Sequence, residues 1–589
     1  MMKIKQAPLL ILMLCSVINM SAQGFLRTQG TEIVNDNGPV IIRSIGTGNW
    51  MIMEGYMMQS SSAGVATHTQ YRNKLIETMG EERTDEFFDT WTENHFAKTD
   101  LDSMKVWGFN AVRAALHYKT LTLTIEEEKR DIDGNLQNTW LENGFEKIDE
   151  LLSWCEQNEM YLILDMHGAP GGQGKNASIS DYDEDLPSLW ESEDNKKKLI
   201  ALWIKLAERY KDEKWIGGFD MINEPNWAFE GSEHPNGCDC ENNDDIWDLH
   251  QRIIQGIRTV NTNHIVYISG NCWGSNYNSF DKHSLQNEDD NMVITFHKYW
   301  NNNNEDALNN WVDMREKYQM PLWMSEGGEN SNTWFSDCIA LYEKNKIGWS
   351  WWPVKKSKIN NIIKVKTNDN YRELISSWKN NTPLSADQTY EAVMQYADNH
   401  KIENSIVAQD VLYAMTEQVK TNDTKPFKKH NLDKAIWFVD YDMGRDGYAY
   451  YDIVSGDYHL DDGTDWIDWN SGNYYRNDGV DISHFNNIPY VGWTEAGEWM
   501  QYTLHISKAG NYNVVINSSA KDAGGVLTIE VNGNIVQENI QLPTTQASDK
   551  WESTTIKGID LPQGEVTVRF HVVKEGSNLL EWSINDVIN

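Results

Sequence analysis

The chain has 589 residues, more than one ordinary domain holds, so two folded units are expected. It carries 88 Asp and Glu against 51 Lys and Arg, a formal net charge of −37. Such an excess of acid argues against nucleic acid or an anionic lipid surface as a partner, and it suits a soluble protein with a neutral ligand.

The N-terminal segment, residues 1–22, has the pattern of a secretory signal peptide. Lysines precede an apolar run from Leu9 to Ile18, and Ser21-Ala22 follows as a small-residue cleavage site. The run is too short to span a bilayer, and no other segment is long and apolar enough. Leu14 is bulkier than the residue usual before a lipidated cysteine, so Cys15 is not expected to be an anchor. We expect a secreted protein, extracellular or periplasmic.

The next 400 residues alternate short apolar runs with amphipathic segments. The runs lack strict alternation, as expected for parallel strands buried on both faces. Helical segments such as GFEKIDELLSWCEQNEM place their apolar residues on one face. Eight such alternations predict a (β/α)8 TIM barrel over residues 23–420, with its active site at the carboxyl ends of the strands. The predicted strands are Ile41–Thr47, Asn110–Leu116, Tyr161–Gly168, Ile216–Asn223, His264–Gly270, Val293–Tyr299, Pro321–Glu326 and Lys346–Trp352.

Polar and aromatic residues collect at the ends of these strands. Two of them are glutamates, Glu224 in NEP and Glu326 in WMSEGG. A pair of carboxylates suits cleavage of a glycosidic bond, because one protonates the departing oxygen while the other attacks the anomeric carbon or activates water. A single buried polar residue often has only a structural role, but convergence on one rim favours a site. The others are Arg113, His167, Asn223, His297, Tyr299, Trp349, Trp351 and Trp352.

From about Gly24 to Lys420 the chain resembles glycoside hydrolase family 5, retaining β-glycosidases on (β/α)8 barrels. The resemblance rests on GFNAVRAAL, LDMHGAPGGQ, NEP, FHKYW, WMSEGG and GWSWWPVK, in this order. It implies that Glu224 is the acid/base and Glu326 the nucleophile, with no cofactor for catalysis. It further implies substrate-binding roles for Arg113, His167, Asn223, His297, Tyr299 and Trp352.

RSIGTGNWMIMEGYM and the long segment TQYRNKLIETMGEERTDEFFDTWTENHF resemble the exo-β-1,3-glucanase branch of that family. On this resemblance Glu54 binds the terminal sugar. Asn49 stands where the branch has a glycine, and the insertion Phe229–Asp245 does not fit. A β-1,3- or mixed-linkage β-glucan from plants, algae or microbes is therefore favoured as substrate. Cellulose, mannan and xylan remain alternatives, and exo or endo action stays open.

The character of the chain changes after residue 420. Residues 421–430, TNDTKPFKKH, form a polar segment that predicts a linker. Residues 431–589 show only short alternating segments, which predicts an all-β sandwich of jelly-roll type. VNGN and KDAGG are expected to be hairpin turns.

Residues Asn431–Asn589 resemble carbohydrate-binding module family 6, chiefly through YVGWTEAGEWMQYTL. The resemblance implies a sugar cleft formed by Trp493, Trp551 and Asn578, whereas Trp499 and Trp582 are expected in the core. The family's calcium-binding glutamates are replaced here by Trp and Val, so a structural calcium is possible but doubtful. The 26 Trp residues of the chain agree with sugar stacking, although many must be core.

Five cysteines follow the predicted signal peptide, an odd number. Cys155 and Cys272 lie in apolar settings and are predicted to be buried thiols. Cys238 and Cys240 suggest a metal site, but no second Cys or His pair follows at a suitable spacing, so metal binding is left open.

The sequence thus predicts a secreted, retaining β-glycanase with a C-terminal polysaccharide-binding module. A non-catalytic polysaccharide-binding protein on a decayed barrel is the alternative from another class. Retention of both glutamates and their supporting residues counts against it.

Overall fold

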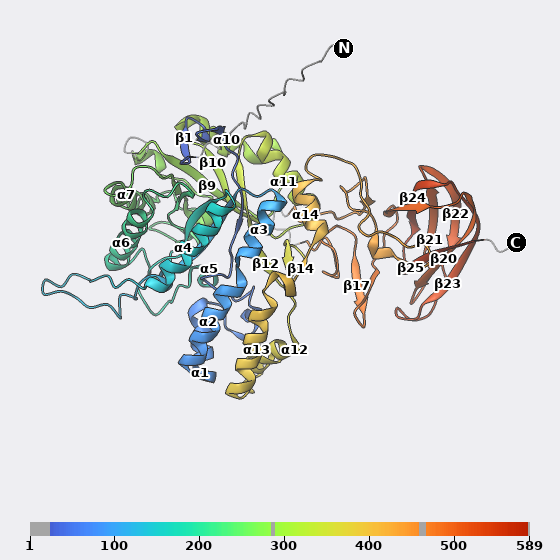
Figure 1. The fold of residues 1–589 in the computed structure, drawn as a ribbon, viewed down its shortest axis with the longest axis horizontal. Coiled ribbons are helices and arrows are strands. Elements are labelled where there is room, and N and C mark those ends of the chain that lie inside the picture. The colour runs from blue at the N-terminus through green and yellow to red at the C-terminus, as the bar shows by residue number, and fades with distance from the viewer. Residues whose placement is uncertain (1–23, 284, 286–288, 459–466, 587–589) are drawn as a thin grey trace, which may run out of the picture.

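The computed structural model describes residues 24–283, 285, 289–458 and 467–586. Figure 1 shows a larger α/β unit beside a smaller all-β unit. The predicted signal peptide, residues 1–22, lies outside the described residues. None of the helices in the described part of the chain has the length and apolar character to cross a membrane.

Eight parallel strands form a closed barrel in chain order, with β11 pairing back to β4. Each overlaps a predicted run, so the predicted barrel is confirmed. The predicted strand Val293–Tyr299, for example, is observed as Met292–Lys298, one residue earlier at each end. The strands are β4 (Arg43–Gly46), β5 (Ala111–His117), β6 (Tyr161–Gly168), β7 (Ile216–Asp220), β8 (Val266–Ile268), β9 (Met292–Lys298), β10 (Leu322–Gly328) and β11 (Gly348–Trp352).

Amphipathic helices surround the barrel and bury their apolar faces against it. In α4, Ile148, Leu151 and Cys155 are fully buried, as the spacing predicts. The helices are α3 (Lys98–Trp107), α4 (Glu142–Gln157), α5 (Ala177–Ser180), α6 (Glu193–Arg209), α7 (Asp244–Arg258), α8 (Asn271–Gly274), α10 (Asn309–Tyr318), α11 (Asn332–Lys344) and α14 (Gln409–Thr416). Short strands outside the barrel are β1 (Arg27–Gln29), β2 (Glu32–Asn35), β3 (Gly38–Pro39), β12 (Lys355–Lys356), β13 (Ile363–Lys364) and β14 (Ile406–Val407).

Four helices form a separate layer that projects from one side of the barrel (Figure 1). They are α1 (His68–Met79), α2 (Glu81–His95), α12 (Asp369–Asn380) and α13 (Ala386–Asn399). Their apolar faces share a core with Met53 and Met58 of the segment that follows β4. The long first βα connection expected from the sequence is therefore largely helical, and it supports the segment that carries Glu54.

The C-terminal unit is a sandwich of two antiparallel sheets around one apolar core, which confirms the predicted all-β sandwich. One sheet has the order β17 (Ile482–Phe485), β18 (Ile488–Val491), β25 (Asn578–Asp586), β20 (Gly510–Ser519) and β23 (Glu552–Leu561), with β15 (Ile436–Trp437) paired to β25. The other has the order β16 (Tyr450–Tyr451), β19 (Trp499–Ile506), β24 (Gly564–Lys574), β21 (Val526–Val531) and β22 (Asn534–Gln541).

One local prediction for this unit is confirmed, the VNGN turn, and two are wrong, the KDAGG turn and the core position of Trp499. VNGN is a hairpin turn, with Asn532 and Gly533 at positive φ between β21 and β22. KDAGG is not a hairpin, because β20 and β21, which it joins, belong to different sheets. Trp582 is buried in the core as expected, but Trp499 is only half-buried and lies under the guanidinium of Arg569 at 4.2 Å.

The cysteine predictions also need correction. Cys238 and Cys272, 34 residues apart, form a disulfide, so Cys272 is not a buried thiol and Cys238 is not a metal ligand. The two cysteines follow β7 and β8, which are neighbours in the barrel, so their loops meet at one rim. Sequence spacing alone does not show this proximity. Cys155 is a buried free thiol as predicted, and Cys240 and Cys338 are also free and buried.

Candidate active site

The predicted barrel residues converge at the carboxyl ends of the strands. Glu224 lies in the loop just beyond β7, with φ of 45°, and only 4% of its surface is exposed. Its Oε1 lies 2.6 Å from Nδ1 of His297 on β9. Asn226 Nδ2 donates to the backbone carbonyl of Glu224 at 2.9 Å and supports this unusual backbone conformation.

Glu326 lies within β10 and is as deeply buried as Glu224. Arg113 Nη1 donates to Glu326 Oε2 at 2.6 Å, and the Tyr299 hydroxyl donates to Glu326 Oε1 at 2.5 Å. Both oxygens of this carboxylate therefore have strong hydrogen-bond donors, one of them cationic.

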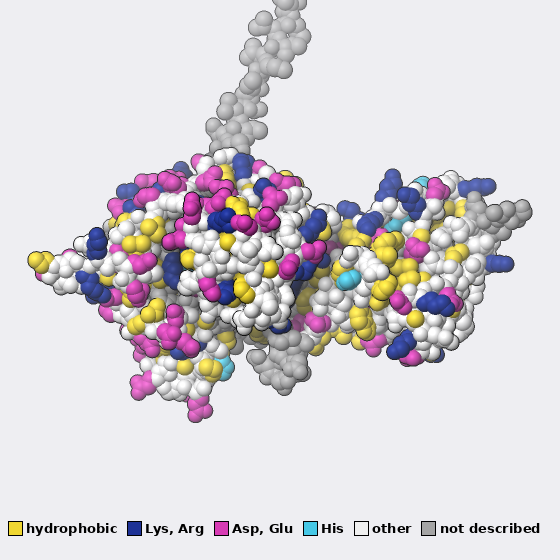
Figure 2. Space-filling model, turned by 90° about the horizontal axis from the view of Figure 1, so that it is seen from below, with side chains coloured by type: hydrophobic (Ala, Val, Ile, Leu, Met, Phe, Trp, Pro, Cys, Tyr) yellow, Lys and Arg dark blue, Asp and Glu magenta, His cyan; other side chains and the backbone are white. Residues whose placement is uncertain are grey.

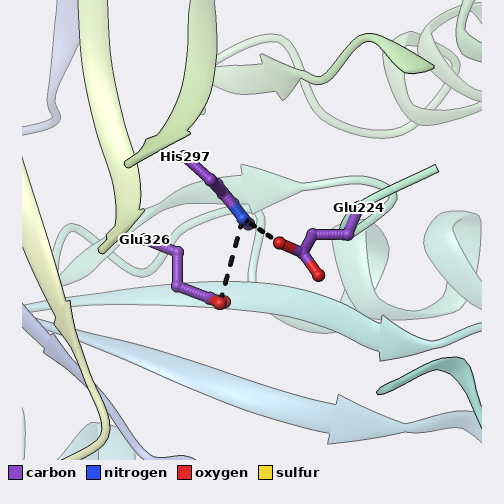
Figure 3. Close-up of side chains that lie close together, drawn as sticks. All are labelled: Glu224, His297 and Glu326. Atoms are coloured by element: carbon purple, nitrogen blue, oxygen red, sulfur yellow. Dashed lines mark hydrogen bonds and ion pairs between the residues drawn. The ribbon is translucent and has the colours of Figure 1, made fainter. Parts of the chain in front are cut away.

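The two glutamates both point toward the same nitrogen of one histidine (Figure 3). His297 Nδ1 is 2.6 Å from Glu224 Oε1 and 3.8 Å from Glu326 Oε1. The histidine nitrogen and one oxygen of each glutamate all lie within 4.8 Å of one another. Retaining glycosidases place their two carboxyl groups about 5–5.5 Å apart, and inverting enzymes about 6.5–9.5 Å apart. The spacing observed here fits the retaining arrangement.

The surroundings move the pKa values of the two carboxyls in opposite directions. Burial is the main cause that raises the pKa of Glu224 above its ordinary value, and the Glu326 charge adds to it against the opposing effect of His297. Burial also acts to raise the pKa of Glu326, but His297, Arg113, His167 and the Tyr299 hydroxyl outweigh it. The net pKa of Glu326 is lowered. One carboxyl is thus set to hold a proton and the other to be ionised.

Arg113 organises the floor of the site from the middle of β5. Its Nε donates to Asp220 Oδ2 at 2.9 Å, and its Nη2 donates to Asn223 Oδ1 at 2.8 Å. Nη2 also lies 3.1 Å from Asp165 Oδ1. These buried partners fix the guanidinium plane, so it can hold Asn223 and Glu326 in one geometry.

His167 lies beside both Trp352 and Glu54. The His167 ring stacks on Trp352, with ring centres 4.6 Å apart and an interplanar angle of 7°. Asp165 Oδ2 lies 2.9 Å from His167 Nδ1. Burial acts to lower the pKa of His167, but the Asp165 charge and hydrogen bond act against burial and help to raise this pKa to about 10. Burial raises the pKa of Glu54 to about 7. Among the described residues, Glu54 Oε1 has no hydrogen-bond partner, and His167 Nε2 is 3.8 Å away. An unpaired buried carboxyl oxygen suits a sugar hydroxyl.

Asn49 stands where the exo-β-1,3-glucanase branch has a glycine, and the structure shows why asparagine fits there. Its φ of 69° lies in the left-handed region, which asparagine tolerates better than most residues. Asn49 Oδ1 accepts a hydrogen bond from the Glu54 backbone N–H at 2.8 Å. The substitution therefore keeps the local backbone and helps to place Glu54.

Sequence reasoning missed a polar edge beside Trp352. Trp352 Nε1 donates to the Tyr56 hydroxyl at 3.2 Å, and Tyr56 donates to Glu329 Oε1 at 3.2 Å. Lys356 forms an ion pair with the same Glu329 oxygen. Glu329 is the first residue after β10, the strand of Glu326, and Tyr56 follows Glu54 by two residues. Nearness in sequence to predicted site residues was therefore the available signal.

Trp349 and Trp351 do not reach the site, contrary to the sequence prediction. Trp351 packs against Trp334 and Phe335 of α11, and Trp349 Nε1 donates to Glu343 Oε1 at 3.2 Å. Successive side chains of a strand point to opposite faces, so these two face the helices while Trp352 faces the site.

The described residues contain one group of His and carboxylate atoms close enough to share a metal ion: Glu224, His297 and Glu326. Arg113 and Tyr299 already bond both oxygens of Glu326. A further cation would stand beside the Arg113 guanidinium, so this group fits an acid/base pair better than a metal site.

In the C-terminal unit, Trp493 is 55% exposed, in the loop after β18. Trp551 packs edge-on against Tyr490 at 5.4 Å. A Cβ added to Gly492 would lie 3.3 Å from the Tyr490 ring and 3.4 Å from Asn578 Oδ1. The predicted cleft residues Trp493, Trp551 and Asn578 are therefore linked through Tyr490 and Gly492 in one loop region. Trp437 and Val439 stand where the resembling family has its calcium-binding glutamates, and Val439 is fully buried.

Comparison with protein families places both units. Residues 77–358 match the cellulase family, glycosyl hydrolase family 5, and residues 468–587 match carbohydrate binding module family 6. The chain is therefore a hydrolase with a glycosyl hydrolase family 5 domain and a C-terminal family 6 carbohydrate binding module.

Its curated relatives carry three kinds of name. Beta-xylosidase of Phanerodontia chrysosporium is 24% identical over 389 residues, which cover 59% of this chain and 75% of the relative. Endoglucanase C of Acetivibrio thermocellus is 28% identical over 217 residues, 36% of this chain and 52% of the relative. Probable glucan 1,3-beta-glucosidase A of Aspergillus clavatus is 22% identical over 270 residues, 45% and 58% respectively. The chain thus spans three quarters of the first relative but little more than half of the other two.

Similar solved structures include Cellulase Cel5C_n, at 16% identity over 63% of this chain and 92% of that one, with a TM-score of 0.37. The beta-glucanase SdGluc5_26A from Saccharophagus degradans is 15% identical over 64% of this chain and 94% of that one, with a TM-score of 0.38.

Proposed function

We propose that the protein is a secreted, retaining β-glycoside hydrolase that acts on β-glucan. The observation that carries the proposal is the pair Glu224 and Glu326, whose oxygens lie within 4.8 Å of each other and whose pKa values are shifted in opposite directions. Two carboxyls so prepared are what a double displacement at an anomeric carbon requires.

In the proposed first step, a carboxylate oxygen of Glu326 bonds to the anomeric carbon while the glycosidic C–O bond breaks. Glu224 gives its proton to the departing oxygen, so the leaving group is a neutral alcohol. Forming the ester removes the Glu326 charge, one of the causes of the raised pKa of Glu224. Glu224 is then ionised and can take a proton from water, whose oxygen bonds to the anomeric carbon while the bond from that carbon to Glu326 breaks.

The supporting residues act before and during this step. Arg113 and Tyr299 keep Glu326 ionised and aimed. Asn223, held by Arg113 at 2.8 Å, is placed to hydrogen-bond the sugar 2-hydroxyl. Trp352, stacked on His167, offers an apolar ring face to the sugar whose glycosidic bond is cleaved.

A β-1,3- or mixed-linkage β-glucan is the favoured substrate. Support comes from Glu54, whose unbonded carboxyl oxygen lies 3.8 Å from Nε2 of His167, and from the relative named as a glucan 1,3-beta-glucosidase. The relatives named as a beta-xylosidase and an endoglucanase keep xylan and β-1,4-glucan as alternatives, beside mannan. The acidic surface of the barrel unit (Figure 2) agrees with a neutral polysaccharide rather than a polyanion.

The C-terminal unit is proposed to bind polysaccharide with Trp493 and Trp551 as stacking faces and Asn578 as a hydrogen-bond partner. The exposed ring of Trp493 supports this role, because an indole face that lies open to solvent can stack on a pyranose. A structural calcium in this unit is not part of the proposal.

Secretion is proposed from the predicted signal peptide together with the Cys238–Cys272 disulfide. Disulfides form and persist mainly in oxidising compartments. Export would place the enzyme where extracellular polysaccharide is found.

A panel of laminarin, lichenan, cellulose, mannan and xylan, together with aryl β-glucoside and β-xyloside, tests the proposal. Products resolved by size over time separate linkages and distinguish exo from endo action. Turnover of laminarin or lichenan well above the others supports the favoured substrate. Turnover of xylan or cellulose alone would move the proposal to those alternatives. Binding without any turnover would favour the non-catalytic protein.

A further inference from the structure

The loop that follows the nucleophile strand lies against the C-terminal unit. It runs from Glu329 to Ser331, between β10 and α11, and Asn330 is 1% exposed. Ser331 caps α11, with its hydroxyl accepting the Trp334 N–H at 3.1 Å. A shift of this loop would therefore act on both β10 and α11.

The Asn330 side chain joins two parts of the chain that are far apart in sequence. Its Oδ1 accepts the Asp457 N–H at 3.0 Å, and its Nδ2 donates to the Asp457 carbonyl at 2.8 Å. The same Nδ2 donates to the Tyr299 carbonyl at 3.1 Å. One amide thus connects the C-terminal unit to the backbone of Tyr299.

Asn477 of the C-terminal unit holds Asn330 from a second direction. Its Nδ2 donates to the Asn330 carbonyl at 2.8 Å and to Asn332 Oδ1 at 3.1 Å. Its backbone carbonyl accepts the Asn332 N–H at 3.0 Å, and its N–H donates to Asp410 Oδ2 at 2.8 Å. Asn477 is fully buried, and the two hydrogen bonds of its Nδ2 together with those of its backbone hold residues 330–332 against the C-terminal unit.

Tyr299 needs support of this kind because of where it lies. Strand β9 ends at Lys298, so Tyr299 is the first residue beyond the barrel ladder. Its hydroxyl must nevertheless reach Glu326 Oε1, which it does at 2.5 Å. The bond from Asn330 to the Tyr299 carbonyl takes the place of the missing ladder.

We propose that the C-terminal unit completes the active site, with Asn477 and the Asp457 backbone holding Asn330 so that Asn330 positions Tyr299 against Glu326. Asn477 and Asn330 are positioning residues in this scheme. The inference rests on the proposed role of Glu326. This role goes beyond the organisation predicted from the sequence, in which a linker joins the barrel to a unit that only binds polysaccharide. The predicted linker itself packs on that unit, with Lys425 and Met443 exchanging backbone hydrogen bonds at 2.9 and 2.7 Å.

The test uses the full chain carrying Asn477→Ala, which removes the side-chain bonds and leaves the backbone of residue 477 in place. Arg445→Ala is the matched control, because it removes another contact between the units, the 2.5 Å ion pair with Asp337, without touching Asn330. Turnover of an activated aryl β-glucoside and hydrogen–deuterium exchange of the peptides around Tyr299 and Asn330 are measured for both variants.

Asn477→Ala is expected to lower kcat about tenfold with KM changed less than about twofold, since a small displacement of a group that acts on the reacting atoms costs mainly chemistry. Exchange around Tyr299 and Asn330 should become faster. Arg445→Ala should keep kcat within about twofold and leave exchange at these peptides unchanged. In a Tyr299→Phe background, Asn477→Ala should cost much less than in the wild type, because both changes act through the same hydroxyl.

Unchanged exchange in Asn477→Ala would overturn the proposal, and so would faster exchange without loss of kcat. Additive losses of kcat in the Tyr299→Phe, Asn477→Ala double variant would mean that Asn477 does not act through the Tyr299 hydroxyl and has only a structural role. If Asn477→Ala does not fold, Asn477→Ser takes its place with the same expected signs. A wild type without turnover on any glycoside would refute the proposed function and the catalytic part of this inference together, while the exchange data would still decide whether Asn477 holds the loop.

Discussion

Removal of the Tyr299 hydroxyl offers a quantitative test of how Glu326 is kept ionised. Tyr299→Phe deletes the 2.5 Å hydrogen bond to Glu326 Oε1 and keeps the ring. Arg113 still donates to the other oxygen at 2.6 Å, so the carboxylate loses one of its two close donors. The Tyr299 hydroxyl is among the groups that lower the pKa of Glu326.

A hydrogen bond to a charged group contributes about 1.5–3 kcal/mol. One pKa unit corresponds to about 1.36 kcal/mol, so loss of this bond should raise the pKa of Glu326 by about 1 to 2 units. The reaction needs ionised Glu326, and activity falls as pH drops through its pKa. The acid limb of kcat/KM should therefore move to higher pH by about 1 to 2 units, as a property of the coupled pair.

The assay is kcat/KM for an activated aryl β-glucoside across the acid and alkaline limbs. Tyr277→Phe is the control, because Tyr277 is a half-buried tyrosine in the segment after β8 whose hydroxyl lies 2.7 Å from the backbone carbonyls of Ile268 and Thr295 and not against a carboxylate. It should lower Tm without moving either limb. An unmoved acid limb in Tyr299→Phe, or an equal shift in Tyr277→Phe, would mean that the Tyr299 hydroxyl does not keep Glu326 ionised.

Three further outcomes are expected. Glu326→Gln should abolish turnover while the protein still folds, whereas azide should restore turnover of activated substrates to Glu224→Ala, because a small anion can attack the covalent intermediate; rescue of Glu326→Gln by azide would contradict the roles. Trp493→Ala should weaken polysaccharide binding by ~1–3 kcal/mol, by analogy with other aromatic stacking platforms, and leave turnover of a short substrate unchanged. The control Phe485→Ala, which removes another exposed ring, should bind normally. Unfolding of the unit in Trp493→Ala would instead mean that the Trp493 ring belongs to the core. Reduction of the disulfide, which spans 34 residues, should lower stability by about 3 to 4 kcal/mol in thermal or denaturant unfolding, and an unchanged Tm would contradict it.

The barrel and the position of its catalytic pair could be predicted because they follow from local pattern. Buried parallel strands leave apolar runs that the sequence displays directly, and topology brings their carboxyl ends to one rim. Trp349 and Trp351 show the limit of that reasoning. Their strand was predicted correctly, but the face that each side chain takes depends on register, which adjacent bulky residues do not reveal.

Contacts between loops that are distant in the chain could not be predicted from the sequence. Cys238 and Cys272 become partners only because β7 and β8 are adjacent in the barrel. Asn330 and Asn477 are 147 residues apart, and neither belongs to a motif that the sequence analysis used. Such pairs are set by how loops meet after folding, and single polar residues in loops carry no periodic signal.

Labelling with a 2-deoxy-2-fluoro β-glucoside that carries a good leaving group would show which carboxylate attacks the anomeric carbon. Fluorine at C2 slows both steps, and the activated leaving group lets the first step outrun the second, so the covalent intermediate should accumulate. One sugar per chain is expected, attached to the peptide that contains Glu326, with activity lost in proportion. A label on Glu224 or Glu54, or complete turnover with no covalent adduct and an inverted product, would contradict it.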